Sequence, residues 1–330
     1  MLLLLFFKTM YRTWRDISKQ RLYIQSFLSP YLADLEQRFD GKFETDQLKK
    51  IKEYYGLFIP VVLCTSYKRL IGAAFTNEEK KRATLFGILT PVGDDLFDID
   101  KLNNEAIEQI TFEPQKFQAH TFSAKVAKEI QTSLLEEVPF HAAYINAAKN
   151  VYEIQLETEK QLNQAITNVD LERITYAKGG YSVIIYMEIL DQKVDEAMRQ
   201  VLFEIGSLMQ LSNDLFDMYK DIQDGITTLA NRCADFAQLK ALFLEKVRAC
   251  NQKLFALPYA QRRKLAFAIS MYLVIGRGLI VIEQMMALEK STSKPLSYAT
   301  LSRKQLICDM EKPVNFLRAL YYAYRLPKLQ

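Results

Sequence analysis

The chain contains few of the residues that end regular secondary structure. Its 330 residues include only 11 Gly and 9 Pro, the two strongest breakers of helices and strands. Long helices joined by short loops need few such residues, whereas a many-stranded sheet needs frequent turns. Apolar residues recur at helical spacing, for example at Tyr23, Phe27, Tyr31 and Leu35. The sequence therefore predicts an all-α fold.

One predicted helix has a clear start. Thr76-Asn77-Glu78-Glu79 has the pattern of a capping box, in which Thr76 caps the helix and Glu79 reaches back to it. This helix is expected to extend to Asp98 and to bend at Pro91 and Gly93.

The remaining helices follow from periodicity, and residues 99–121 are the least regular part. No repeat and no low-complexity linker divides the chain. We therefore predict one all-helical domain over residues 1–330, a bundle of about ten helices, with residues 1–10 as an N-terminal extension. The other predicted ranges are 11–39, 44–72 with an interruption near Pro60, 123–136, 139–164, 170–190, 194–224, 236–256, 259–289 and 301–324.

Composition and charge exclude several classes of protein. Hydrophobic residues make up 49% and charged residues 25% of the chain, which is ordinary for a globular protein. The net charge of +4 is spread along the sequence without a dense basic block, so nucleic acid is not an expected partner. The cysteines lie far apart and form no C-x-x-C pair, which predicts buried thiols and a cytoplasmic location; they are Cys64, Cys233, Cys250 and Cys308.

The sequence begins with an apolar run, Leu2–Phe7, followed by Lys8, Arg12 and Arg15. A secretory signal carries its positive charge before a longer apolar core, so this run is not expected to be one, and it is too short to span a bilayer. Two alternatives stay open: a helix start packed on the body, with or without translation from Met10, and a shallow peripheral membrane contact. No later segment reaches about 18 uncharged apolar residues, so an integral membrane protein is not expected.

Two acidic clusters give the strongest indication of function. The first, Asp94-Asp95-Leu96-Phe97-Asp98, lies at the end of a predicted helix, and the second, Asn213-Asp214-Leu215-Phe216-Asp217-Met218-Tyr219-Lys220-Asp221, lies inside another. Side chains four residues apart lie within about 40° of each other on a helix. Asp94 and Asp98 therefore share a face, as do Asn213, Asp217 and Asp221. A solvated acidic face is one interpretation; a magnesium site is the other, because magnesium favours such hard oxygen ligands.

The motifs resemble those of the class I isoprenoid synthase superfamily. The first cluster matches the D-D-x-x-D motif of trans-prenyltransferases and class I terpene synthases. The second is similar to the N-D-x-x-S-x-x-K-E motif of bacterial terpene synthases and, through Met209, Gln210, Asn213, Asp214 and Asp217, to the second aspartate-rich motif of prenyltransferases. The resemblance implies that magnesium, about three ions in all, is held by Asp94, Asp95, Asp98, Asn213, Asp217 and Asp221.

A third element, Lys178-Gly179-Gly180-Tyr181-Ser182, precedes the second cluster. The resemblance implies that Arg173, Lys178 and Lys220 bind a diphosphate, and that Arg173 and Lys178 act in catalysis with Asp94 and Asp98. It also implies a helix break at Gly179 and Gly180. Adjacent glycines inside a helix cost about 1 kcal/mol each relative to alanine. A close crossing with another helix is the alternative reason for them.

The implied activity is the magnesium-dependent ionisation of a polyprenyl diphosphate, with release of pyrophosphate and cyclisation or elimination to a terpene. The allylic cation would need a dry pocket whose aromatic faces offset its charge. Candidate wall residues are Phe86, Leu89, Phe97, Tyr181, Phe203 and Phe216.

Departures from the family pattern keep alternatives open. Asp217 and Asp221 replace a Ser or Thr and a Glu, and no arginine lies between Ile99 and Glu105 where prenyltransferases carry an arginine pair. A trans-prenyltransferase and a non-catalytic prenyl diphosphate-binding relative remain the alternatives, and a homodimer is a further expectation. A di-iron bundle is not expected, because neither His120 nor His141 follows a Glu at the required spacing.

Overall fold

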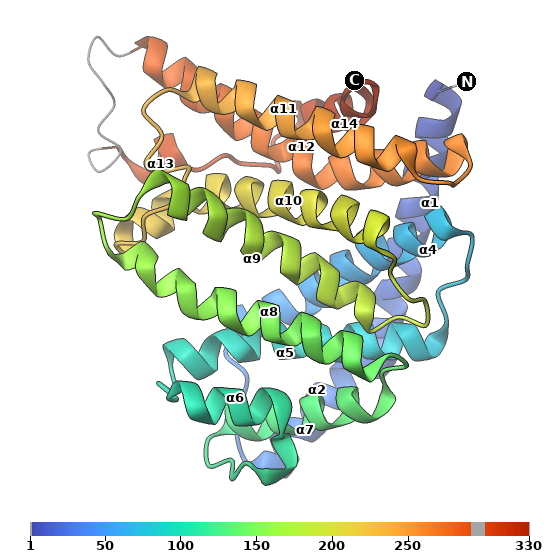
Figure 1. Ribbon diagram of the computed structural model, residues 1–330, viewed down its shortest axis with the longest axis vertical. Coiled ribbons are helices and arrows are strands. Elements are labelled where there is room, and N and C mark those ends of the chain that lie inside the picture. The colour runs from blue at the N-terminus through green and yellow to red at the C-terminus, as the bar shows by residue number, and fades with distance from the viewer. Residues whose placement is uncertain (1, 292–300, 330) are drawn as a thin grey trace. The chain divides into compact units, whose positions relative to one another are not determined.

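The computed structural model of the chain describes residues 2–291 and 301–329, except for the side chain of Asp98. Helices account for 81% of the structure (Figure 1), and the described residues contain no strand. The all-α prediction is therefore confirmed. The chain divides into two compact units: unit 1 comprises Met1–Phe6, Asn150–Ile184 and Val194–Gln330, and unit 2 comprises Phe7–Lys149 and Ile185–Lys193. That they form one domain stays a prediction.

Unit 2 is built around α5 (Asn77–Asp98), which packs against α7 (Phe122–Glu137) and against η2 (Lys50–Thr65). Its core is formed by fully buried aliphatic side chains, among them Leu28, Leu35, Ile51, Leu63, Leu70 and Leu85. The other elements of this part of the chain are α1 (Leu2–Tyr23), which begins in unit 1, η1 (Ile24–Leu28), α2 (Ser29–Phe39), α3 (Thr45–Lys49), α4 (Ser66–Ile71), α6 (Asn104–Phe112) and η3 (Pro114–Lys116).

Two details of unit 2 differ from the sequence-based expectations. The predicted interruption near Pro60 is a change of helix type, because η2 is a π-helix that contains Pro60 and continues into α4. Proline lacks a backbone N–H and cannot donate the usual α-helical hydrogen bond. This accounts for a change of hydrogen-bonding pattern at Pro60 in a helix that does not break. The segment 99–121, expected to be irregular, contains the short helix α6, which is capped by Asn103.

Unit 1 is organised around α12 (Gln261–Ser291), which packs against α10 (Glu196–Gln223), α11 (Phe236–Ala256) and α14 (Pro313–Arg325). The bounds of α11 are those predicted, and those of α12 differ by two residues at each end. The other elements are α8 (His141–Glu157), which begins in unit 2, η4 (Thr158–Leu162), α9 (Asn168–Glu188), which ends in unit 2, α13 (Arg303–Leu306) and η6 (Leu326–Lys328).

Within the described part of the chain, α12 is the one helix long and apolar enough to cross a membrane. Of its most apolar window, 72% is buried inside the protein. A buried core helix meets the same criteria of length and composition, so the finding is weak evidence for a membrane span.

The four cysteines are thiols without a disulfide; Cys64, Cys250 and Cys308 are buried as predicted, whereas Cys233 is half-buried. Burial raises the pKa of Cys250 to about 12 and that of Cys233 to about 11. Because the thiolate is the reactive form, these side chains are inert at neutral pH.

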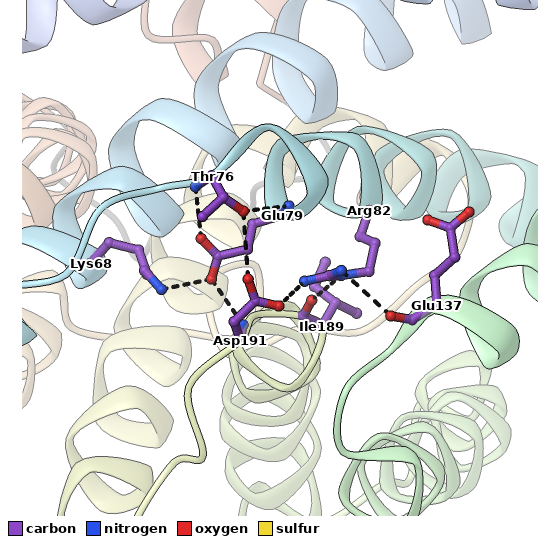
Figure 2. A network of polar contacts seen from close by, with 7 residues as sticks. All are labelled: Lys68, Thr76, Glu79, Arg82, Glu137, Ile189 and Asp191. Atoms are coloured by element: carbon purple, nitrogen blue, oxygen red, sulfur yellow. Dashed lines mark hydrogen bonds and ion pairs between the residues drawn. The ribbon is translucent and has the colours of Figure 1, made fainter.

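The start of α5 is held by a buried carboxylate, Glu79 (Figure 2). Thr76 Oγ1 accepts a hydrogen bond from the Glu79 backbone N–H at 3.1 Å, and Glu79 Oε2 accepts one from the Thr76 N–H at 2.9 Å. This confirms the predicted capping box. Glu79 Oε1 also accepts hydrogen bonds from Lys68 Nζ at 2.6 Å and from the Asp191 N–H at 2.8 Å. The side chains of Lys68 and Glu79 are only 3% and 0% exposed.

Arg82, one turn further along α5, extends this network (Figure 2). Its Nε donates to the Ile189 carbonyl at 2.7 Å, and its guanidinium forms an ion pair with Asp191. The segment 185–193 is thereby attached to α5 by both Glu79 and Arg82.

We expect Glu79→Ala to lower the free energy of unfolding by about 3–5 kcal/mol, because it leaves the Lys68 ammonium buried without its partner. Urea denaturation measures this change. The control is Glu78→Ala, which removes an exposed carboxylate from the same helical turn and should change the stability by about 1 kcal/mol or less. Equal losses in the two variants would contradict the prediction.

Candidate functional site

Three carboxylates form a row along the last turns of α10. Asp214, Asp217 and Asp221 are separated by three and then four residues, which places them on one face of the helix. Asp214 is buried, and Asp217 and Asp221 are half-buried. Asn213 is exposed and donates from Nδ2 to Asp217 Oδ2 at 3.2 Å. The row that faces the protein thus includes Asp214. This residue was not among the metal ligands predicted from the sequence.

Both oxygens of the Asp214 carboxylate accept a hydrogen bond. Gln210 Nε2 donates to its Oδ1 at 2.8 Å, and Thr175 Oγ1 donates to its Oδ2 at 3.2 Å. Burial raises the pKa of Asp214 to about 6, although these hydrogen bonds and the charge of Lys178 act in the opposite direction. The spacing Gln210-x-x-x-Asp214 was the signal in the sequence that could have identified this residue.

Asp221 is electrostatically coupled to the rest of the row. Burial raises its pKa to about 7, and the negative charges of Asp214 and Asp217 add to the effect. The cations Lys220 and Lys178 lower it, but by less. A bound cation would stabilise the ionised forms of these carboxylates, because it offsets both the cost of their burial and their mutual repulsion.

Lys178 lies on α9, within electrostatic range of Asp214 and Asp221, and α9 passes very close to α10. A Cβ added to Gly179 would lie 2.1 Å from the Gly206 carbonyl oxygen, and one added to Gly206 would lie 2.1 Å from the Gly179 carbonyl oxygen. A Cβ at Gly180 would lie 2.3 Å from the Phe203 ring. Ser207 Oγ donates to the Tyr176 carbonyl at 3.0 Å across the same contact.

The expected helix break at Gly179 and Gly180 is therefore corrected. α9 runs unbroken from Asn168 to Glu188, and the glycines serve the close helix crossing that was the alternative explanation. Small residues are needed here because the two backbones are in contact and leave no room for side chains. The crossing brings Thr175 and Lys178 of α9 beside the acidic face of α10.

The other two predicted diphosphate-binding cations have different surroundings. Arg173 Nη1 donates to Glu157 Oε1 at 2.9 Å, its Nη2 pairs with the second oxygen of Glu157, and Asp170 Oδ1 lies 3.7 Å away. Hydrogen bonds from Arg173 and Lys160 lower the pKa of Glu157 to about 2. Arg173 would have to leave Glu157 to bind a phosphate group. Lys220 is exposed on α10.

The first acidic cluster lies in unit 2, in the last turns of α5. Asp94 is exposed, and Asp95 is half-buried and accepts a hydrogen bond from Gln47 Nε2. The Asp95 carbonyl also accepts from the Asp100 N–H at 2.9 Å, which closes the end of the helix. The side chain of Asp98 lies outside the described part of the structure. That Asp94 and Asp98 share a metal-binding face stays a prediction.

The predicted wall residues occupy several separate environments. Tyr181 and Phe203 pack edge to face at 5.5 Å, against a buried cluster of Ile154, Ile166, Leu171, Ile174 and Ala177. Phe216 lies beneath the Arg277 guanidinium at 5.4 Å. In unit 2, Phe86 packs edge to face with Tyr186 at 4.7 Å, and Leu89 and Phe97 are half-buried. A pocket in unit 1 is lined by none of the predicted site residues; its lining is Asn251, Gln252, Phe255, Gln261, Leu265, Pro327, Lys328 and Leu329.

In the described residues, no three His, Cys, Asp or Glu side chains are gathered into a group that could hold a metal ion. No protein family model and no curated protein matches this chain. The resemblance to isoprenoid synthases therefore rests on the motifs themselves.

We expect Gly206→Ala to destabilise the protein by about 1–3 kcal/mol or more, because the added methyl group would overlap the Gly179 backbone. Gly93→Ala is the matched control: this glycine also lies inside a helix, but nothing would lie within 4 Å of an added Cβ. There the same substitution should stabilise by up to about 1 kcal/mol through helix propensity. Chemical denaturation of both variants tests the difference, and equal stabilities would contradict the close crossing.

Stability should also depend on pH through Asp221. Its pKa of about 7 in the folded protein lies above the value of about 3.9 for an unfolded chain. The folded state thus holds this proton more tightly, so the wild-type protein loses stability as pH rises from about 4 to about 7. Asp221→Asn removes that loss and should raise Tm more at pH 8 than at pH 5, by about 2–4 °C.

The measurement is thermal denaturation in EDTA at the two pH values. Asp224→Asn is the control, since Asp224 is exposed just beyond the end of α10. Its substitution should shift Tm equally at both pH values. An Asp221→Asn variant with the same behaviour would show that neither burial nor the neighbouring carboxylates raise the pKa of Asp221.

Proposed function

We propose that this protein ionises a polyprenyl diphosphate in a magnesium-dependent reaction, releasing pyrophosphate and forming a terpene by cyclisation or elimination. The observation that carries the proposal is the row of Asp214, Asp217 and Asp221 beside Lys178. The carboxylates of the row could bind metal ions, and Lys178, on the crossing helix, could bind an anion. The arrangement therefore suits a ligand that consists of metal ions and an anion.

The donor set fits magnesium. Magnesium retains several waters and is usually bound by one or two carboxylates together with substrate phosphates. A protein that uses it in this way needs acidic groups along one face, and it does not need a complete cage of side chains. Asp217 and Asp221 would provide these oxygens, and Asn213 adds a carboxamide oxygen at the exposed edge. When bound, magnesium supplies the positive charge that stabilises a departing pyrophosphate.

The side chains around the row have separate roles in this proposal. Lys178 would bind a phosphate oxygen and help to stabilise its charge as the carbon–oxygen bond breaks. Thr175 and Gln210 hold the Asp214 carboxylate in place through the hydrogen bonds described above. Asp94, Asp95 and Asp98 are proposed as the first magnesium-binding motif.

A trans-prenyltransferase is the second candidate, and the contact between Gln210 and Asp214 favours it. These two residues belong to the part of the sequence that resembles the second aspartate-rich motif of prenyltransferases. Their hydrogen bond gives a structural reason for that pairing of residue types. A transferase would also require a site for a second prenyl substrate.

The test is to incubate purified protein with geranyl, farnesyl, geranylgeranyl and longer prenyl diphosphates, with magnesium or with EDTA. Pyrophosphate and hydrocarbon products are measured. We expect magnesium-dependent release that falls by about 100-fold or more in Asp217→Asn, Lys178→Gln and Asp94→Asn, by analogy with the loss of a group that stabilises transition-state charge. Asp224→Asn should retain activity.

Addition of isopentenyl diphosphate separates the two candidates, because only the transferase would then form a longer prenyl diphosphate. A folded protein that binds magnesium but releases pyrophosphate from none of these substrates would contradict both. That result would favour a non-catalytic protein that binds prenyl diphosphates.

A further inference from the structure

The helix α1 exposes a broad apolar face, while part of the face that it buries is polar. Thr9, Thr13 and Gln20 are at most 7% exposed, and Gln20 Nε2 donates to the Gly56 carbonyl at 2.6 Å. Leu5 and Phe6 are also buried, at 7% and 6% exposed, but most of the large apolar residues of the helix lie outside: Leu3, Leu4, Phe7, Tyr11, Trp14 and Leu22 are between 54% and 74% exposed. A surface helix of a protein surrounded by water exposes mainly polar and charged residues instead.

The exposed apolar residues form one continuous stripe. Leu4, Phe7, Tyr11 and Trp14 are separated by three, four and three residues, which aligns them along the helix. The rings of Tyr11 and Trp14 lie 6.1 Å apart. Single exposed apolar residues are common on protein surfaces, but a contiguous stripe of large ones marks an interaction surface.

A row of cations runs along one side of this stripe. Lys8, Arg12, Arg15 and Lys19 are all exposed, and at 100° per residue they lie roughly 60–120° round the helix from the middle of the stripe. The only acidic residue in the sequence of α1 is Asp16. Asp16 is directed to Arg69, at 2.6 Å, and to Arg15, at 3.6 Å, so the outer face of the helix carries no carboxylate.

Charge decides between the two occupants that this surface suits. A second copy of the helix offers these cations no negative charge, because its outer face has the same cations and no carboxylate, and an antiparallel pair would bring the two rows of like charge together. An anionic lipid surface complements the cations and accepts the apolar side chains below its head groups. Tryptophan and tyrosine are also the residues enriched at the boundary between head groups and acyl chains.

We propose that α1 is an interfacial membrane-binding helix. It lies in the plane of an anionic bilayer, with Leu4, Phe7, Tyr11 and Trp14 inserted at the boundary of the acyl chains. Lys8, Arg12, Arg15 and Lys19 contact the head-group phosphates. The proposed membrane-binding surface therefore covers most of α1 and is not limited to the apolar run at residues 2–7. The proposal is independent of the proposed enzymatic function, because lipid binding is measured without any substrate.

The protein carries its own reporter, because Trp14 is the only tryptophan in the chain. The full-length protein is titrated with vesicles of phosphatidylcholine, with or without phosphatidylglycerol, and tryptophan emission is recorded. We expect a blue shift and quenching by brominated acyl chains with the anionic vesicles. Binding to the neutral vesicles should be weaker by about tenfold or more, and added salt should weaken binding to the anionic ones.

Two variants that retain Trp14 test the two parts of the surface. Leu4→Ser should weaken binding to both kinds of vesicle, and Arg12→Glu should remove most of the preference for anionic lipid. The matched control is Leu317→Ser on α14, where the leucine is 63% exposed. It should bind as the wild-type protein does.

Three results would overturn the proposal. One is the absence of any emission shift with vesicles while circular dichroism shows the protein to be folded. Another is a blue shift without lipid that grows with protein concentration and accompanies a dimer in ultracentrifugation, which would assign the stripe to a second copy. The third is an equal loss of binding in Leu4→Ser and Leu317→Ser, which would mean that lipid binding is not located on α1.

Discussion

The backbone contact between α9 and α10 is the constraint on which the candidate site depends. Because Gly179 and Gly206 have no side chains, the helices approach until their main chains touch. Side chains near the crossing are then forced together: Thr175 reaches Asp214, and Lys178 lies within electrostatic range of Asp214 and Asp221. The same proximity removes water from the carboxylates, which raises their pKa values. The close approach of the two helices at these glycines thus also contributes to the raised pKa values of the site.

Local sequence signals predicted much of the fold. The capping box at Thr76 and Glu79 predicted the start of α5, and apolar periodicity predicted both the first and the last residue of α11. These features depend on neighbours within one or two turns, which the sequence shows directly. The π-helical form of η2 around Pro60 and the unbroken course of α9 depend on what packs against them. Tertiary contacts of that kind override local preference, so periodicity could not predict them.

The sequence predicted which types of residue form the candidate site more successfully than it predicted which of those residues face the protein. The sequence identified the acidic stretch of α10, but steps of four residues selected Asn213, which is exposed, and omitted Asp214, which is buried. Which of two adjacent polar residues faces the protein depends on the neighbouring helix. The ion-pair partner of Arg173 could not be predicted from the sequence either, because Glu157 lies sixteen residues earlier on a different helix. A cation identified from a motif can therefore already be engaged by a carboxylate that the motif does not include.

The bonds from Glu79 and Arg82 to residues 189 and 191 have a consequence for biosynthesis. Unit 2 combines residues 7–149 with residues 185–193, and the second segment leaves the ribosome roughly several seconds after the first, at typical translation rates. During that interval the Lys68–Glu79 pair lacks the Asp191 N–H donor, and Arg82 lacks the Ile189 carbonyl and the Asp191 carboxylate. Water must therefore take the place of these partners until the residues that follow α9 have been synthesised. Folding of the N-terminal half is thus coupled to the completion of a helix that belongs mainly to the other unit.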